Sequence, residues 1–420
     1  MLDIIRAGDP RYESFRHTYT ATGSPATILR VRTAEEVAEA LAVARHHAAP
    51  FAVRSGGHGI SSISTNDGGT VIDLSALNTV ERLGGTRVRI GPGARWGHVA
   101  ETLFPWGLAL TSGDSGDVGV GGLATTGGIG LLGRKQGLTI DRLRAVDLVT
   151  ADGTIRRADA THEPDLFWAV RGAGANVGIA TAFEFDADTT PVVAHATIAY
   201  GLGDVAGFLA RWGTVVEAAP REVSAFLYLG VGFAQATVVV ASDSTEVATA
   251  ALAPFADLPG VAGARAELVP YATVPLTSDA PHRGQQSAHV HSGLVDHLDH
   301  ESARVIAALV PAVDMVQIRS VGGAINDVAA DATAYAHRHQ NFSVTAMSMG
   351  SRSRFDDAWA GARSVMDGMY LSFETDHGPE AISAAFPEPT LSRLRAIKAT
   401  WDPEGIFSQN FDVSMPAATG

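Results

Sequence analysis

The chain has 420 residues, of which 46% are hydrophobic and 18% are charged, and it contains no cysteine. This length can bury a large core and suggests two to three domains. The lack of cysteine excludes disulfides, thiolate metal sites and cysteine nucleophiles, and the formal net charge of −14 argues against sequence-independent binding of nucleic acid.

The start of the chain and its apolar runs bear on location. Residues 1–10 lack the basic and apolar regions of a secretory signal. No stretch approaches eighteen uninterrupted apolar residues, so we expect no membrane span. The sequence predicts a cytoplasmic monomer or homodimer whose partners are small molecules.

The first 190 residues predict short strands alternating with helices. Thr33 and Glu36 have the spacing of a capping box, and apolar residues at helical spacing follow them to about residue 47. Residues 151–154 carry the signal of a hairpin turn. Further helices are expected over 96–104 and 164–170, and strands over 50–53, 70–74, 87–90 and 145–150.

From about Pro191 the glycine clusters become rarer and β-rich runs appear. Strands are expected over 224–229 and 234–241, and helices over 247–253, 301–309, 356–366 and from 391 until Pro403 ends the last one. We predict an α+β protein with a domain over 1–190, an inserted substrate domain over 191–382, and a segment over 383–420 that returns to the first domain.

One histidine lies within a glycine-rich turn. The run Arg54, Ser55, Gly56, Gly57, His58, Gly59 follows the apolar run 50–53. Glycine permits positive φ and a close approach of the backbone to a flat ligand, which a Cβ prevents. The alternative is a strand-end turn that happens to carry a histidine, since glycine-rich turns are common.

A second and denser glycine run covers residues 111–130. Backbone amides of such a loop can surround a phosphate or pyrophosphate. Gly119 to Ala124 fits the dinucleotide fingerprint, with Asp141 about twenty residues after Gly121. That fingerprint must follow a buried strand and open a helix, whereas the residues on both sides here are rich in glycine and unfavourable for a helix.

Four segments in order resemble the FAD-binding domain of the vanillyl-alcohol-oxidase superfamily, in its berberine-bridge-enzyme-like branch. They are residues 54–59, 117–141, 165–181 and the tail from Trp401 to Asn410. The resemblance implies a PCMH-type two-lobed FAD-binding domain with an inserted α+β substrate domain, in which helices flank an antiparallel sheet.

The resemblance also implies FAD with a single covalent bond from its 8α carbon to His58. Ser115 stands where bi-covalent members carry a cysteine, and Thr126 replaces a family glycine. Val118 matches the position that controls access of oxygen, where a valine is similar to the oxidases; the alternative is a core valine. The implied cofactor-binding residues are Arg54, Ser55, Gly56, Gly57, His58, Gly59, Asp114, Ser115, Val118, Gly119, Gly121, Gly122, Gly127, Gly128, Gly130, Asp141, Gly174, Asn176, Gly178, Ile179 and Asn410.

Oxidation of a hydroxyl or amine needs a proton acceptor near the flavin N5 atom. Residues 369–373 resemble the family's tyrosine-containing strand, where Tyr370 is either the base or a packed aromatic. In that strand Tyr370 and Ser372 would share one face. Family members often carry asparagine at Ser372 and a second tyrosine at Phe373.

The histidines offer other candidates for the base. His289 and His291 are two residues apart and share a face if they lie on a strand, but no third ligand accompanies them, so we expect no metal site. Tyr335, His337, Arg338 and His339 resemble a substrate-domain segment of bacterial members and could supply a base or an anion anchor. The candidate catalytic residues are Tyr370, His289, His291 and His337.

The sequence therefore predicts an FAD-dependent oxidase of secondary metabolism. It would transfer a hydride from an alcohol, amine or similar carbon of a sugar, alkaloid or other small organic substrate to flavin N5, with O2 reoxidation giving H2O2. Three alternatives stay open: a dehydrogenase of the same fold, a flavoprotein that performs a non-redox cyclisation, and a non-catalytic flavin carrier.

Overall fold

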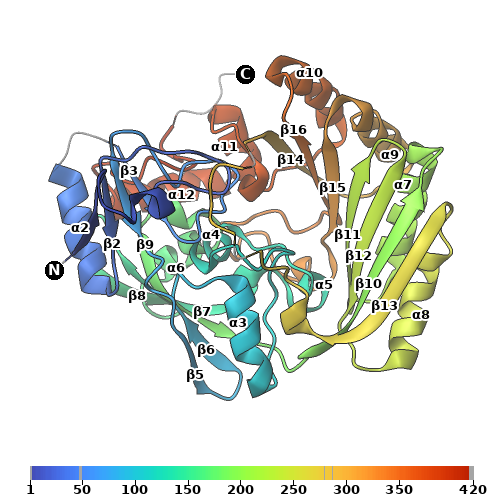
Figure 1. Cartoon of the computed structure of the whole chain (residues 1–420), viewed down its shortest axis with the longest axis horizontal. Helices are drawn as coiled ribbons and strands as arrows, with labels where there is room; N and C mark the ends of the chain where they lie inside the picture. The colour runs from blue at the N-terminus through green and yellow to red at the C-terminus, as the bar shows by residue number, and fades with distance from the viewer. Residues whose placement is uncertain (1, 47–49, 279, 286, 416–420) are drawn as a thin grey trace.

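The computed structural model describes residues 2–46, 50–278, 280–285 and 287–415. Two lobes lie side by side (Figure 1). The first lobe holds two small sheets with most of the N-terminal helices, and the second holds one large sheet with helices along its outer side.

A four-stranded sheet begins the first lobe. Its order is β1 (Asp3–Ile5), β2 (Thr27–Arg30), β4 (Thr70–Asp73), β3 (Phe51–Arg54), and the last three strands run parallel. Val37, Leu41 and other apolar residues of α2 (Ala34–His46) pack against this sheet, as their helical spacing predicted.

The predicted capping box of α2 is confirmed in one of its two hydrogen bonds. The Thr33 hydroxyl accepts the N–H of Glu36 at 3.2 Å, which satisfies one unpaired donor of the first turn. The Glu36 carboxylate, however, accepts the N–H of Arg32 rather than that of Thr33.

A five-stranded antiparallel sheet completes the first lobe. Its order is β5 (Val80–Gly84), β6 (Arg87–Ile90), β9 (Ile179–Asp186), β7 (Leu143–Val149), β8 (Ile155–Asp159). The predicted hairpin turn joins β7 to β8, and Gly153 within it has a φ of 79°. Helices complete this lobe: α1 (Tyr12–Phe15), α3 (Trp96–Leu103), α4 (Val120–Thr126), α5 (Gly133–Gln136), α6 (Pro164–Ala173), α11 (Pro379–Ala385) and α12 (Thr390–Trp401).

The second lobe is built on a seven-stranded antiparallel sheet. Its order is β13 (Val261–Pro270), β10 (Val192–Gly201), β12 (Phe233–Val240), β11 (Val223–Gly230), β15 (Met315–Ser320), β16 (Phe342–Ser348), β14 (His289–Val295). Four helices cover its outer face: α7 (Val205–Ala218), α8 (Thr245–Ala256), α9 (His300–Ala307) and α10 (Arg352–Ala362).

The inner face of this sheet packs on the first lobe. Phe226 and Leu294 point to that side, and they join one buried cluster with Tyr271, Tyr335 and Tyr370. Alternation along the strands sends their neighbours to the helix-covered side. The interface between the lobes is therefore where the glycine loops meet the side chains of the large sheet, and the predicted PCMH-type α+β fold is confirmed.

Three expectations about local structure are wrong. Residues 371–373 form a short 3-10 helix, η8 (Leu371–Phe373), so Tyr370 and Ser372 are not alternating strand residues. A helix, α4, does open after Gly119 despite its glycines, because Val120 and Ala124 are buried in the core. Helix α10 ends at Ala362, four residues before the expected end, and a 3-10 turn over Arg363–Val365 continues the chain.

Candidate active site

The two glycine-rich loops touch through their backbones. A Cβ on Gly56 would lie 2.4 Å from the nitrogen of Gly119, and a Cβ on Gly119 would lie 2.2 Å from the nitrogen of Gly56. Ser55 tightens the contact, because its hydroxyl accepts the N–H of Gly121 at 3.2 Å and donates to Pro92 O. Only glycine fits at both positions, and the contact brings the amides of both loops to one place.

Replacing Gly119 with alanine should abolish flavin retention, because the new methyl group forces the two loops apart. Gly113 lies in the same loop, and a methyl group there would meet no atom within 4 Å, so Gly113→Ala is the matched control. We expect the purified Gly119 variant to be colourless and the Gly113 variant to keep the flavin content of the wild type, as read from the visible absorbance. A fully loaded Gly119 variant would show that the contact between the loops does not matter for the cofactor.

His58 lies beside this contact with its imidazole between two aromatic rings. The ring stacks on Tyr19 at a centroid distance of 4.1 Å, and His282 meets it edge-on at 5.6 Å. Burial, with repulsion from His282, lowers the pKa of His58 to about 4. The imidazole is therefore neutral at pH 7 and keeps a nucleophilic lone pair.

A segment of the second lobe crosses over these loops, which the sequence did not indicate. Ser278 donates from its N–H (2.9 Å) and its hydroxyl (2.6 Å) to Asp117, and His282 Nε2 bonds Gly56 O at 2.9 Å. Ser115 forms a parallel bridge with Leu276. The glycine loops are thus held between the first lobe and this crossing segment.

A half-buried polar cluster joins the second loop to the large sheet. The Tyr228 hydroxyl donates to Asp114 Oδ2, Gln317 Nε2 donates to the same oxygen at 3.2 Å, and Arg319 Nη2 lies 3.6 Å from Oδ1. Burial alone would raise the pKa of Asp114, but Arg319 and the Tyr228 hydroxyl outweigh it and lower the pKa. Asp114 is therefore a carboxylate at neutral pH.

Tyr370 lies close to this cluster, in the interface between the lobes. Its hydroxyl accepts the N–H of Gly128 at 3.1 Å, and its ring centroid is 5.8 Å from that of Phe373. Ser372 bonds the hydroxyl of Thr126 at 2.7 Å. The segment that carries Tyr370 is therefore docked on the end of the second glycine loop.

His291 faces away from Tyr370, which contradicts its predicted place beside the reacting carbon. Its ring stacks on Phe355 (4.8 Å) on the helix-covered side of the sheet, and its nitrogens bond Glu374 (2.9 Å) and Asp356 (3.0 Å). Burial lowers its pKa, but the two carboxylates outweigh burial and raise it. A cavity of about 190 Å³ lies beside His291 and Glu374, and residues of α10 and α11 also line it.

The structure also places His289 and His337 where neither would act as the predicted catalytic base. His289 precedes His291 by two residues on β14, so it points to the same outer side. His337 is buried with Nε2 bonded to Ala385 O at 3.1 Å, and its ring fills the space beside Gly368. His337 is therefore held by the packing of the fold, and neither histidine is presented to the glycine loops.

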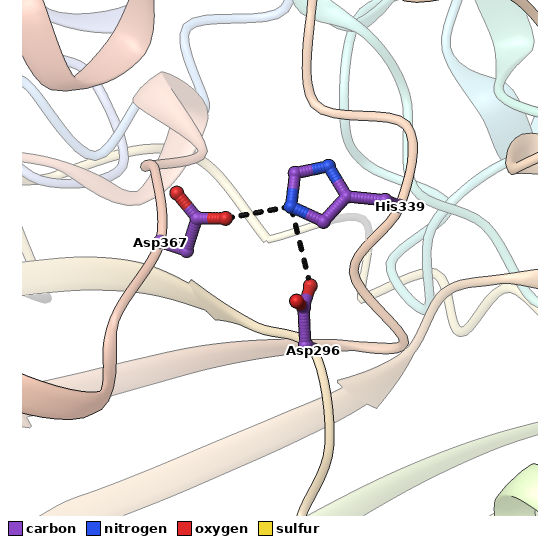
Figure 2. A group of neighbouring side chains, drawn as sticks. All are labelled: Asp296, His339 and Asp367. Carbon is purple, nitrogen blue, oxygen red and sulfur yellow. Dashed lines mark hydrogen bonds and ion pairs between the residues drawn. The ribbon is translucent and has the colours of Figure 1, made fainter.

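His339 lies at the surface between two carboxylates (Figure 2). Its Nε2 is 2.6 Å from Asp367 and 3.3 Å from Asp296. Their negative charge would repel an anion, so the structure does not support His339 as an anion anchor. Arg338 is likewise used internally, since it makes a bidentate pair with Asp141 at 2.8 Å to each oxygen.

Several residues implied in cofactor binding make contacts that hold the loops in place. Asn176 binds the C-terminal tail, donating to Phe411 O (3.2 Å) and accepting the N–H of Val413 (3.1 Å). Arg54 pairs with the buried Asp73 at 2.7 Å. Asp141 accepts the N–H of Leu138 as well as pairing with Arg338.

At several other positions implied in cofactor binding, close packing requires glycine. A Cβ on Gly174 would lie 2.6 Å from Thr125, and one on Gly178 would lie 2.8 Å from Leu148. A Cβ on Gly127 would lie 3.1 Å from the ring of Tyr370. Val118 packs against the core of the first lobe. The cofactor role of these positions stays a prediction.

The site has the features that a bound flavin requires. The backbone contact between the loops excludes side chains, and the imidazole of His58 is neutral. Within the described ranges, the buried polar atoms that lack a hydrogen-bond partner include Arg54 Nη2, His282 Nδ1 and Asn410 Oδ1. Such atoms are costly unless a ligand or water satisfies them. Fold and site together agree with the two-lobed FAD-binding architecture that the resemblance predicted.

Comparison with known proteins agrees with this class. Residues 25–159 match the family model described as an FAD binding domain. The chain is 38% identical over 189 residues to the (R)-6-hydroxynicotine oxidase of Paenarthrobacter nicotinovorans, a match that covers 44% of the chain and 41% of that relative. It is 27% identical to the uncharacterized FAD-linked oxidoreductase YgaK of Bacillus subtilis, over 98% of the chain and 96% of that relative.

The fold is shared with glucooligosaccharide oxidase from Acremonium strictum, at a TM-score of 0.86 and 21% identity over 99% of this chain and 98% of that one. The chain carries an FAD binding domain and its relatives include FAD-linked oxidoreductases and oxidases, as the resemblance to the berberine-bridge-enzyme-like branch predicted. The first three curated relatives are matched over only 41%, 33% and 31% of their own lengths. Over the described residues no helix has the length and apolarity needed to cross a membrane.

Proposed function

We propose that this protein is an FAD-dependent oxidase that removes a hydride from a carbon bearing a hydroxyl or amine group of a small organic substrate. The observation that carries the proposal is the backbone contact of Gly56 with Gly119 beside the neutral imidazole of His58. When bound, FAD accepts a hydride at N5 and passes the electrons to O2, which gives H2O2. The nicotine oxidase and the oligosaccharide oxidase named above carry the same class of activity in their names.

We propose that His58 bonds the 8α carbon of FAD, as the sole covalent link. The neutral ring supplies the lone pair that such a bond needs, and Tyr19 holds the ring in one plane. The glucooligosaccharide oxidase is named for a 6-S-cysteinyl, 8α-N1-histidyl FAD. This chain has Ser115 at the position that resembles the cysteine, and it contains no cysteine. A thioether bond in addition to the histidine link therefore cannot form.

The proposal for O2 as electron acceptor rests on Val118, whose small side chain lies in the second glycine loop. The interface between the lobes is the place for the substrate, because Phe226, Tyr228 and Tyr370 meet the glycine loops there. We propose no metal for the reaction, and a cytoplasmic location remains a proposal from the sequence.

Mixing the purified holoprotein with candidate substrates under anaerobic conditions tests this function. Suitable probes are 6-hydroxynicotine, cello-oligosaccharides and simple alcohols, and we expect at least one to bleach the visible flavin band. Admitting air should restore the band and generate H2O2. Bleaching without rapid recovery in air would indicate a dehydrogenase, substrate conversion without bleaching a non-redox enzyme, and no response to any probe would contradict the proposal.

A further inference from the structure

The cluster of Asp114, Tyr228, Gln317 and Arg319 brings together groups from three separate parts of the chain. Asp114 comes from the second glycine loop, Tyr228 from β11, and Gln317 and Arg319 from the neighbouring strand β15. Asp114 is the point at which the cofactor loop touches the substrate sheet. Its side chain keeps 30% of its exposure, so a ligand in the interface can reach it.

Arg319 is held on one side of the cluster by two aromatic rings. Its guanidinium carbon lies 4.0 Å from the centroid of Phe373 and 5.1 Å from that of Phe226. The side chain is 6% exposed, and within the described part of the chain its Nε–H has no hydrogen-bond partner. Since Asp114 already balances the positive charge, the free donor suits a neutral oxygen better than an anion.

We propose that Tyr228 and Asp114 together take the proton of a neutral, hydroxyl-bearing substrate, an inference that rests on the proposed oxidase function. The substrate C–H bond breaks and its electron pair leaves as a hydride to FAD. The O–H proton passes to Tyr228 Oη, while the proton of Tyr228 passes to Asp114 Oδ2 and a carbonyl forms. Arg319 and Gln317 position Asp114, and the free Arg319 Nε–H holds a second substrate oxygen.

The contacts of the two interface tyrosines favour Tyr228 over Tyr370 as the proton acceptor. A neutral phenol can accept a proton only if it releases its own, and Tyr228 has a carboxylate in contact for this purpose. Tyr370 instead receives the N–H of Gly128, and no carboxylate contacts its hydroxyl over the ranges that the structure describes. Phe373, whose ring lies beside that of Tyr370, has no hydroxyl.

Anaerobic stopped-flow reduction of the holoenzyme tests the proposal, with whichever probe bleaches the wild type most rapidly. Tyr228→Phe should slow flavin reduction by about 10²- to 10⁴-fold. Tyr271→Phe is the matched control, because its buried hydroxyl bonds Ser112 in the same loop but does not contact Asp114. We expect the Tyr271 variant to stay within about tenfold of the wild type, which is about 1.4 kcal/mol, and Tyr370→Phe to lose less than Tyr228→Phe.

The pH dependence separates proton transfer from a structural role. Because the pKa of Asp114 is lowered, its carboxylate stays charged to a lower pH than a free aspartate does, and wild-type reduction should be flat between about pH 5 and 8. In Asp114→Asn the acceptor is lost, so the residual rate should rise with pH as hydroxide takes the proton. A variant whose fold is merely weakened would be slow without this new slope.

The reduction rates and pH profiles of these variants distinguish failure of the proton relay from failure of the oxidase function. Equal rates for Tyr228→Phe and wild type, or a large loss confined to Tyr370→Phe, would overturn the proton relay from the substrate through Tyr228 to Asp114. Either result would leave the oxidase function standing. If Tyr228→Phe does not fold with bound FAD, the rate and pH slope of Asp114→Asn decide alone. If no probe bleaches the wild type, the oxidase function fails and the relay fails with it.

Discussion

Replacing His58 with alanine should give a protein that still folds and binds FAD but releases all of it on denaturation. Among the residues that the structure describes, the imidazole contacts the rings of Tyr19 and His282, so its loss leaves the backbone contact between Gly56 and Gly119 in place. The wild type should instead keep its yellow colour on the polypeptide after acid precipitation. The measurement is the flavin fluorescence of the washed protein band on a denaturing gel.

His98→Ala is the control for this experiment, because His98 is an exposed residue of α3 in the same lobe. It should retain covalent flavin as the wild type does. Flavin that stays bound to the His58 variant through denaturation would place the covalent link on another residue. A wild type that loses its flavin would show that FAD is held without a covalent bond, and would leave the FAD-binding domain itself unaffected.

The local signals of the sequence predicted the first lobe well. Thr33 and Glu36 marked the start of α2, and residues 151–154 marked the hairpin between β7 and β8, because both depend on contacts within a few residues. The glycine loops were also visible, since only glycine permits the contact between Gly56 and Gly119. The domain limits at 190 and 382 stay a prediction.

The residues that complete the site could not be found in this way. Tyr228 and Arg319 lie on paired strands that are about ninety residues apart in the chain, and Asp114 meets them only after the lobes dock. Periodicity showed that His289 and His291 share a face, but not that helix α10 covers this face. Residues 369–373 form a short apolar run, and such runs do not distinguish a strand from a turn of helix.

The tail that resembles the family's closing motif contains a fully buried ion pair, in which Lys398 contacts Asp402 at 2.8 Å. The two side chains are 4% and 0% exposed. The ammonium also donates to the carbonyl oxygens of Asn176 and Phe407, and the carboxylate accepts the N–H groups of Ile406 and Phe407. The pair thus joins helix α12 to the segment over residues 165–181 and to the turn that follows the helix.

Lys398→Met should lower the free energy of unfolding by about 3–5 kcal/mol, because it leaves the Asp402 carboxylate buried without its cation. The double variant Lys398→Met with Asp402→Asn should regain part of this loss, since the uncompensated charge is then gone. Arg363→Met provides the control: its pair with Glu380 is exposed, so the change should cost less than about 1 kcal/mol. Thermal unfolding of the wild type and these three variants at equal flavin content measures the effects. Equal destabilisation by Lys398→Met and Arg363→Met would mean that the buried pair contributes no more than a surface contact, and that packing of α12 alone holds the tail on the first lobe.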